Sequence, residues 1–178
     1  MRKIFLRGRP GVGKSTVVKR VYEVLSSRGV KVGGIMTLEE RIGGRRVGFR
    51  VVDLINGRSG WLARVGGGEP RVGKYRVLLQ EFEDVGVKAL YDALESSCLI
   101  VCDEIGPMEL KSREFRKIIV KIIEGEKPVL GVIHHRLSGE LLHKVEKYGE
   151  IIEVTQQNRN RLPDEIAAQL LQELKRLR

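Results

Sequence analysis

The first chemically informative feature of the sequence is a glycine-rich segment that ends in lysine and serine. Residues Gly8–Ser15 match the phosphate-binding pattern G-x-x-x-x-G-K-[ST] in full. In this pattern the glycines turn backbone N–H groups toward phosphate oxygens, the lysine reaches the β- and γ-phosphates, and the hydroxyl binds Mg²⁺. A dinucleotide fingerprint is excluded because the overlapping segment lacks its third glycine. The predicted contacts with nucleotide are Gly8, Arg9, Pro10, Gly11, Val12, Gly13, Lys14, Ser15 and Thr16.

A pair of carboxylates supplies the second half of such a site. Four apolar residues, Leu99–Cys102, run directly into Asp103 and Glu104. Asp103 suits the Mg²⁺-binding aspartate of a Walker B strand, and Glu104 is placed to polarise a water molecule for in-line attack on the γ-phosphorus. The alternative is a pair of solvated carboxylates at a strand end. We predict Glu104 and Lys14 as catalytic residues, with Ser15 and Asp103 as ligands of Mg²⁺.

Two further segments have side chains that could contact phosphate. His134 and His135 end an apolar run and are followed by Arg136, and a polar, basic segment at 155–161 contains Arg159. A phosphate sensor and an arginine that contacts nucleotide in the same subunit are the functional interpretations, whereas solvated surface loops are the structural one. The sequence lacks the Asn-Lys-x-Asp segment that reads guanine, so a regulatory GTPase is disfavoured.

Short apolar strands alternate with amphipathic helices along most of the chain. Strands are expected at 3–7, 31–37, 98–102, 128–133 and 151–154, and the apolar faces of helices at 17–25, 85–94, 115–123, 141–148 and 166–177. Ser112 and Ser138 are expected N-caps of the third and fourth helices. This alternation predicts an α/β P-loop NTPase with a mostly parallel sheet and helices on both faces.

Residues 38–80 have a different character and form a predicted antiparallel insertion within a single domain, 1–178. Gly43-Gly44 and Asn56-Gly57 separate short alternating runs, which is typical of β-hairpins. Nine basic residues face four acidic ones here, so this segment holds half of the net charge of +10. Such a charge indicates an anionic partner, although a charge-rich surface of the thermophilic type explains it equally well.

The composition limits the class of protein. The chain has 178 residues, of which 42% are hydrophobic and 31% charged, and no apolar run approaches the ~20 residues of a membrane helix. We therefore expect a cytoplasmic protein without a membrane partner. Cys98 and Cys102 sit four residues apart on a predicted strand, about 13 Å from each other, which is too far for a mutual disulfide.

The chain resembles the thermophile nucleoside-triphosphatase family, which includes the vertebrate cancer-related nucleoside-triphosphatase. The resemblance rests on Gly8–Ser15, on the run Val101-Cys102-Asp103-Glu104-Ile105-Gly106-Pro107-Met108-Glu109-Leu110, and on Asn158-Arg159. It implies a RecA-like sheet and slow, Mg²⁺-dependent hydrolysis of ATP, GTP, CTP and UTP to the diphosphate and phosphate. It also implies nucleotide contacts at Leu99, Ile100, Val101, Cys102, Asp103, Glu104, Ile105 and Gly106.

Two other activities remain open at this stage. A nucleotide or polynucleotide kinase is compatible with the size and the phosphate loop, but it has no need of Glu104 to activate water. A nucleic-acid-dependent ATPase fits the net charge, but the few aromatic residues of the basic segment, Phe49, Trp61 and Tyr75, make a nucleic-acid partner the less favoured reading. The sequence does not indicate the oligomeric state.

Overall fold

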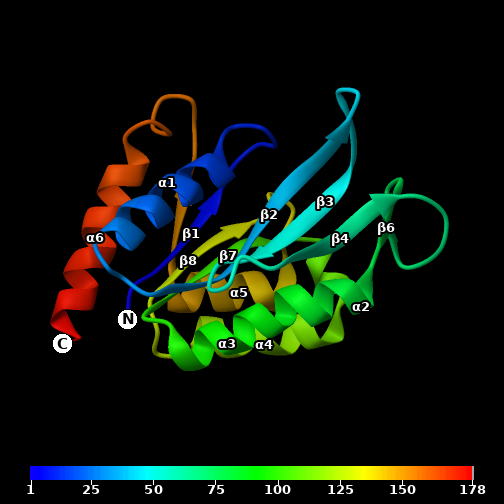
Figure 1. Ribbon diagram of the computed structural model, residues 1–178. Coiled ribbons are helices and arrows are strands. Elements are labelled where there is room, and N and C mark those ends of the chain that lie inside the picture. Colours follow the sequence, from blue (N-terminus) through cyan, green and yellow to red (C-terminus); the bar gives the residue numbers. More distant parts are fainter. Residues whose placement is uncertain (178) are drawn as a thin grey trace.

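The computed structural model describes residues 1–177 and is built on one mixed β-sheet (Figure 1). Within these residues the nine strands lie in the order β5-β6-β4-β3-β2-β7-β8-β1-β9. From β2 to β9 every pairing is parallel, and from β5 to β2 every pairing is antiparallel. The strands are β1 (Lys3–Arg7), β2 (Val32–Ile42), β3 (Arg45–Asp53), β4 (Ser59–Val65), β5 (Arg71–Val72), β6 (Tyr75–Val77), β7 (Leu99–Ile105), β8 (Val129–Ile133) and β9 (Glu150–Glu153).

Helices cover both faces of the parallel half of the sheet, which confirms the predicted α/β fold. Figure 1 shows α1 and α6 on one face and α3, α4 and α5 on the other. On β1, Ile4 and Leu6 join the core beneath α1 and α6, whereas Phe5 joins the opposite core, as the two-residue period of a strand requires. The helices are α1 (Lys14–Ser27), α2 (Leu79–Phe82), α3 (Lys88–Ser96), α4 (Arg113–Glu124), α5 (Gly139–Tyr148) and α6 (Leu162–Arg176).

The strand order brings the two predicted halves of the site to one edge. β8 lies between β1 and β7 and pairs in parallel with both. The carboxyl ends of parallel strands meet at the same edge of a sheet, which is where ligands bind in open α/β folds. The phosphate loop after β1 and the carboxylates at the end of β7 are therefore two strand spacings apart, about 10 Å.

The predicted antiparallel insertion is a lateral extension of the same sheet. β2 begins at Val32, pairs in parallel with β7 through Ile35, and then continues to Ile42 as the partner of β3. We name the antiparallel part, β3 to β6 together with residues 38–42 of β2, the sheet extension. The sequence predicted a strand at 31–37 and a separate insertion from residue 38, whereas β2 runs without interruption from Val32 to Ile42 and its antiparallel pairing with β3 already begins at Ile35.

Some local predictions hold and others need correction. The Ser112 hydroxyl accepts a hydrogen bond from the Phe115 N–H at 3.1 Å and caps α4, whereas Ser138 occupies the N-cap position of α5 without a side-chain hydrogen bond. The helix predicted at 85–94 begins at Leu79 and passes through a π-helical turn, Glu83–Val87, before α3. Cys98 and Cys102 are both free thiols, and within residues 1–177 no helix is long and apolar enough to cross a membrane.

Candidate active site

The loop between β1 and α1 has the backbone that a phosphate requires. A side chain at Gly8 would lie 2.8 Å from the carbonyl oxygen of Val154, so the chain directly after β9 can approach only a glycine here. Gly13 is the N-cap of α1 with a φ of 112°, a left-handed conformation that other residues rarely adopt. The first turn of α1 has no acidic residue and no side-chain cap. Its amide N–H groups and the positive end of the helix dipole therefore remain available for an anion.

Lys14 lies across the mouth of this loop. Its Nζ donates hydrogen bonds to the carbonyl oxygens of Gly8, at 2.7 Å, and Arg9, at 3.0 Å. Burial lowers the pKa of Lys14, while the carboxylates of Glu104 and Asp103 act in the opposite direction. The ammonium is thus within electrostatic reach of both acidic residues at the end of β7, as the sequence predicts.

Asp103 is the buried acid of the site. It is only 2% exposed, and the hydroxyl of Thr37 on β2 donates a hydrogen bond of 2.8 Å to its carbonyl oxygen. Burial raises the pKa of Asp103 to about 7, and the Ser15 hydroxyl opposes this shift. Its Oδ2 has no hydrogen-bond partner in the part of the chain described. An unpartnered buried carboxylate oxygen next to a hydroxyl fits Mg²⁺, which prefers oxygen ligands and stays partly bound to water and phosphate.

Glu104 is directed out of the sheet by an irregularity in β7. Asp103 pairs with Val132 and Ile105 with the next residue, Ile133, so Glu104 is the extra residue of a bulge. Bulges beside active sites change the direction of a side chain, and here the Glu104 carboxylate folds back over Gly106. A side chain at Gly106 would lie 2.8 Å from Glu104 Oε1. Burial raises the pKa of Glu104, and the Lys14 ammonium lowers it.

Glu109 is a third acidic residue, for which the sequence predicts no catalytic or binding role. It starts a short 3-10 helix, Glu109–Lys111, and is 3% exposed with an unpartnered Oε2. Burial, followed by the nearby charge of Glu104, raises the pKa of Glu109 well above its usual range. The only signal in the sequence is its place in the Asp-Glu-Ile-Gly-Pro-Met-Glu-Leu run, because spacing alone does not show that residue 109 turns back toward residue 104.

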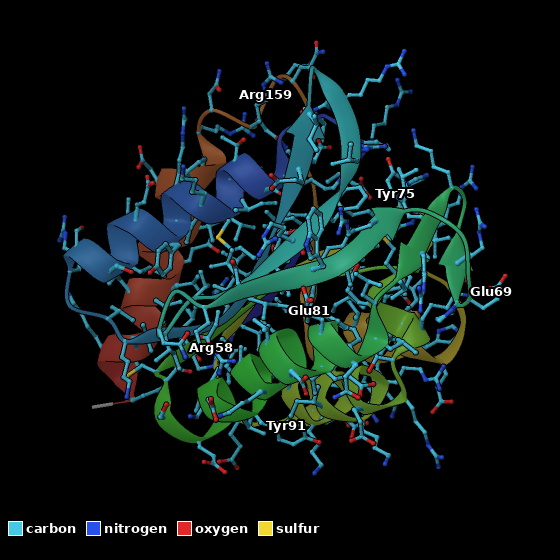
Figure 2. All side chains as sticks on the ribbon, turned by 45° about the vertical axis from the view of Figure 1, so that its right-hand side comes forward. Arg58, Glu69, Tyr75, Glu81, Tyr91 and Arg159 are labelled. Carbon is cyan, nitrogen blue, oxygen red and sulfur yellow. The ribbon has the colours of Figure 1, made fainter. Side chains whose placement is uncertain are left out.

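The loop after β9 brings Arg159 to the phosphate loop. Arg159 Nη1 donates a hydrogen bond of 3.2 Å to the carbonyl oxygen of Val12, and its Cδ lies beside Gly13. Arg159 is labelled in Figure 2. Asn158 shapes this loop, since its Oδ1 accepts from the Thr155 N–H at 2.8 Å and its Nδ2 donates to the Glu153 carbonyl at 2.7 Å. The contact in the same subunit that the sequence suggested is therefore geometrically available.

His134 lies at the same edge of the sheet, at the end of β8. Its backbone N–H donates to the Ile105 carbonyl at 3.0 Å, and its Nδ1 accepts from the Arg136 N–H at 3.1 Å. The neutral ring therefore carries its proton on Nε2. Burial lowers the pKa of His134, with smaller contributions from His135 and Lys14. His135 and Arg136 are exposed, so His134 is the member of this group that the structure brings beside Lys14.

The remaining predicted contacts differ in accessibility. Arg9, Pro10, Gly11, Ser15 and Thr16 are exposed on the loop and at the start of α1. By contrast, the side chains of Leu99, Ile100, Val101, Cys102 and Ile105 are 0% exposed, and Gly106 is buried too. Of the predicted contacts in 99–106, Glu104 alone keeps partial exposure. The buried residues hold β7 in the core, so of the contacts predicted in this segment the Glu104 side chain is the one that solvent reaches.

Comparisons with known proteins agree with this geometry. A family described as NTPase matches residues 3–167. The nucleoside-triphosphatase THEP1 of Thermofilum pendens is 49% identical over 173 residues, which is 95% of each chain. The THEP1 of Methanocaldococcus jannaschii is 40% identical over 97% of this chain and 99% of its own.

Two solved structures share the fold. The crystal structure of THEP1 from the hyperthermophile Aquifex aeolicus matches with a TM-score of 0.81 and 30% identity, over 94% of this chain and 98% of the other. The solution structure of a human cancer-related nucleoside triphosphatase matches with a TM-score of 0.80 and 38% identity, over 96% and 97%.

Proposed function

The chain belongs to the NTPase family and is a nucleoside-triphosphatase, and from that premise we propose that its reaction depends on Mg²⁺, accepts all four common bases and is slow. The observation that carries the proposal is the convergence of the Lys14 ammonium with the carboxylates of Asp103 and Glu104 at the mouth of the phosphate loop. These three groups have the charges needed at a transferring phosphoryl group, at its metal and at the attacking water.

Different residues bind the triphosphate and accept the proton of the attacking water. The amides of Gly8–Ser15 and the ammonium of Lys14 bind and orient the triphosphate. Glu104 accepts a proton from water as the water oxygen forms a bond to the γ-phosphorus and the bond to the β-phosphate oxygen breaks. Its raised pKa makes it a stronger base than an exposed glutamate. The products are the nucleoside diphosphate and inorganic phosphate.

Ser15 and Asp103 would hold Mg²⁺. The chemistry that Mg²⁺ would supply there is positive charge against the negative charge of the phosphates. Asp103 must be ionised to act as a ligand, and the neighbouring Ser15 hydroxyl favours that form. Broad base tolerance follows from the absence of a guanine-reading segment in the sequence.

Slow turnover follows from the position of Arg159. An arginine at the transferred phosphate raises the rate of P-loop hydrolases by about 10³–10⁵. In this chain the guanidinium of Arg159 donates to the backbone carbonyl of Val12 on the phosphate loop. Because it is held there, we infer that it is not optimally placed at the transferred phosphate. We place turnover below the enzyme median of about 10 s⁻¹.

Phosphate release from ATP, GTP, CTP and UTP, with Mg²⁺ and with excess chelator, tests the proposal. We expect release from all four in the presence of Mg²⁺ and loss of release with the chelator. Glu104→Gln should lower release from every nucleotide by about 10²–10⁴, with Glu23→Gln on the exposed face of α1 as the matched control. Transfer of label from [γ-³²P]ATP to an acceptor, without free phosphate, would instead identify a kinase.

A further inference from the structure

The sheet extension has one covered face and one open face. Phe49, Tyr75 and Val77 point into the core shared with α2 and α3, which lie below the extension in Figure 1. Among the described residues no helix covers the opposite face of β3, β4 and β6. The exposed or half-exposed side chains there include Leu38, Arg50, Trp61, Arg64 and Arg76.

The open face carries a row of arginines in direct cross-strand register. Arg64 on β4 pairs with Arg76 on β6, which in turn pairs with Arg71 on β5. Neighbouring strands are about 4.8 Å apart, and like charges directly opposite one another destabilise a sheet. Within residues 1–177 none of the three forms an ion pair, whereas Arg41 and Arg46 at the tip of the extension both pair with Glu39. A bound polyanion would relieve this repulsion.

The indole ring of Trp61 adjoins the row. A side chain at Gly48 would lie 3.0 Å from Trp61 Cζ3, so the indole lies across the sheet above this glycine. Arg64 and Arg50 stack on the indole, with their Cζ atoms 4.4 and 4.8 Å from the ring centroid. The stacking fixes the planes of the two guanidinium groups and leaves N–H donors for phosphate oxygens.

We propose that this open face, formed by Arg50, Trp61, Arg64, Arg71 and Arg76, binds single-stranded nucleic acid. Unpaired guanidinium groups in a row would contact successive phosphates, and the planes of Trp61 and its stacked arginines would support bases. The indole with its stacked guanidinium groups favours a single strand, because the bases of a duplex are already stacked on one another. An acidic protein would use the positive charge but not the stacked planes.

The chain contains a built-in reporter for this test, because Trp61 is its only tryptophan. Titration with a labelled 20-nucleotide oligo(U) or oligo(dT), without NTP, is followed by oligonucleotide anisotropy and by Trp61 fluorescence. We expect saturable binding at about 50 mM salt with quenching of Trp61, and a steep loss of affinity at higher salt. A duplex of equal length and a polyglutamate of equal charge should bind more weakly and leave Trp61 unquenched.

A double variant locates the site. Arg64→Gln with Arg76→Gln should weaken oligonucleotide binding at least tenfold and reduce the slope of log K against log[salt] by about 1.4, the value for two lost phosphate contacts. The control is Arg20→Gln with Arg28→Gln, which changes the net charge by the same amount at two exposed residues in or next to α1. This control should bind the oligonucleotide as the parent does. NTP hydrolysis without oligonucleotide should stay within twofold in both double variants.

Three outcomes would overturn the proposal. The first is the lack of binding at low salt, and the second is an equal loss of affinity in the α1 control. The third is binding of polyglutamate or duplex as tight as that of the single strand, with equal quenching. Each is independent of whether the phosphate loop hydrolyses NTP.

Discussion

The parallel half of the sheet and the sheet extension differ in the burial of their charged side chains. In the parallel half, Asp103 and Glu109 are buried with unpartnered oxygens, and their pKa values are raised. In the sheet extension, the charged side chains other than Asp53 are exposed or half-exposed, and several stack on aromatic rings or pair with Glu39. Buried unpartnered carboxylates cost stability, whereas exposed guanidinium groups cost little.

The difference follows from how many faces of each half are covered. Helices on both sides bury every residue of β7 except Glu104, so the end of the strand can hold the Asp103 carboxylate away from water. The extension has helices on one side only, and it shows the alternation of buried and exposed residues that a half-covered sheet requires. Changes in the parallel half should therefore alter chemistry and stability strongly, and changes in the extension should alter them weakly.

The largest effect is expected at the phosphate loop. Lys14→Ala should abolish both tight NTP binding and hydrolysis, because the variant loses the cation that lies across the loop. Isothermal titration and a phosphate-release assay measure the two losses. Lys19→Ala, an exposed residue on the same helix, should behave as the parent does. Parental affinity and rate in Lys14→Ala would show that the site lies elsewhere.

Glu104→Gln should separate binding from chemistry. The amide keeps the size of the side chain but cannot accept the proton of the attacking water. We expect near-parental affinity for Mg·ATP and a fall in kcat of about 10²–10⁴, the usual effect of removing a positioned base. Pre-steady-state and steady-state kinetics on one preparation provide both quantities. A parental kcat would assign the base to another residue.

Asp103→Asn tests the cost of burying a carboxylate. The pKa of Asp103 is about 7 in the folded protein and near 3.8 in an unfolded chain. Between those values the folded protein keeps a proton that the unfolded chain has lost, so its stability falls as the pH rises from about 4 to about 7. The variant should therefore have a higher free energy of unfolding than the parent at pH ~8, by roughly 4 kcal/mol at most.

Chemical denaturation of the nucleotide-free proteins at pH ~4 and ~8 measures this difference. We expect the difference between parent and variant to shrink toward zero at the lower pH. There the folded parent and the folded variant both carry a neutral side chain at position 103. A stabilisation of equal size at both pH values would have to come from packing, and would contradict the electrostatic explanation.

Arg159→Ala should have an intermediate effect, because this residue contacts the phosphate loop without lying in the core. We expect a weaker nucleotide affinity or a lower rate by about tenfold, independent of protein concentration. Arg161→Ala is the matched control on the same loop, where Arg161 pairs with Glu165 in solvent. A rate per subunit that rises steeply with concentration would indicate an arginine supplied by a second copy of the chain.

The smallest effect is expected in the sheet extension. Arg50→Gln removes one exposed cation–π contact with Trp61 and one hydrogen bond to the Ser59 hydroxyl. We expect a loss of about 0.5–1 kcal/mol in the free energy of unfolding and no measurable change in kcat. Denaturation and phosphate release on the same sample test both. A rate change above about threefold would show that the two halves of the sheet are coupled.

The sequence by itself determined the chemistry of the phosphate loop and the alternation of strands and helices. Gly8–Ser15 form a contiguous motif, so its geometry is local and the glycine and lysine positions alone specify it. The buried faces of α1 and α4 were equally predictable, because Val17, Val21, Phe115 and Ile119 repeat at helical spacing. Local rules of this kind need no knowledge of the rest of the chain.

Only the tertiary structure decided what surrounds these motifs. It set the bulge that redirects Glu104, the return of Glu109 to the same site, and the contact of Arg159 with Val12 across 147 positions. It also showed that β2 joins the two halves of the sheet and that Trp61 lies on a different face from Phe49 and Tyr75. Each of these depends on strand pairing between distant segments, and a sequence pattern reports the period of a strand but not its partners.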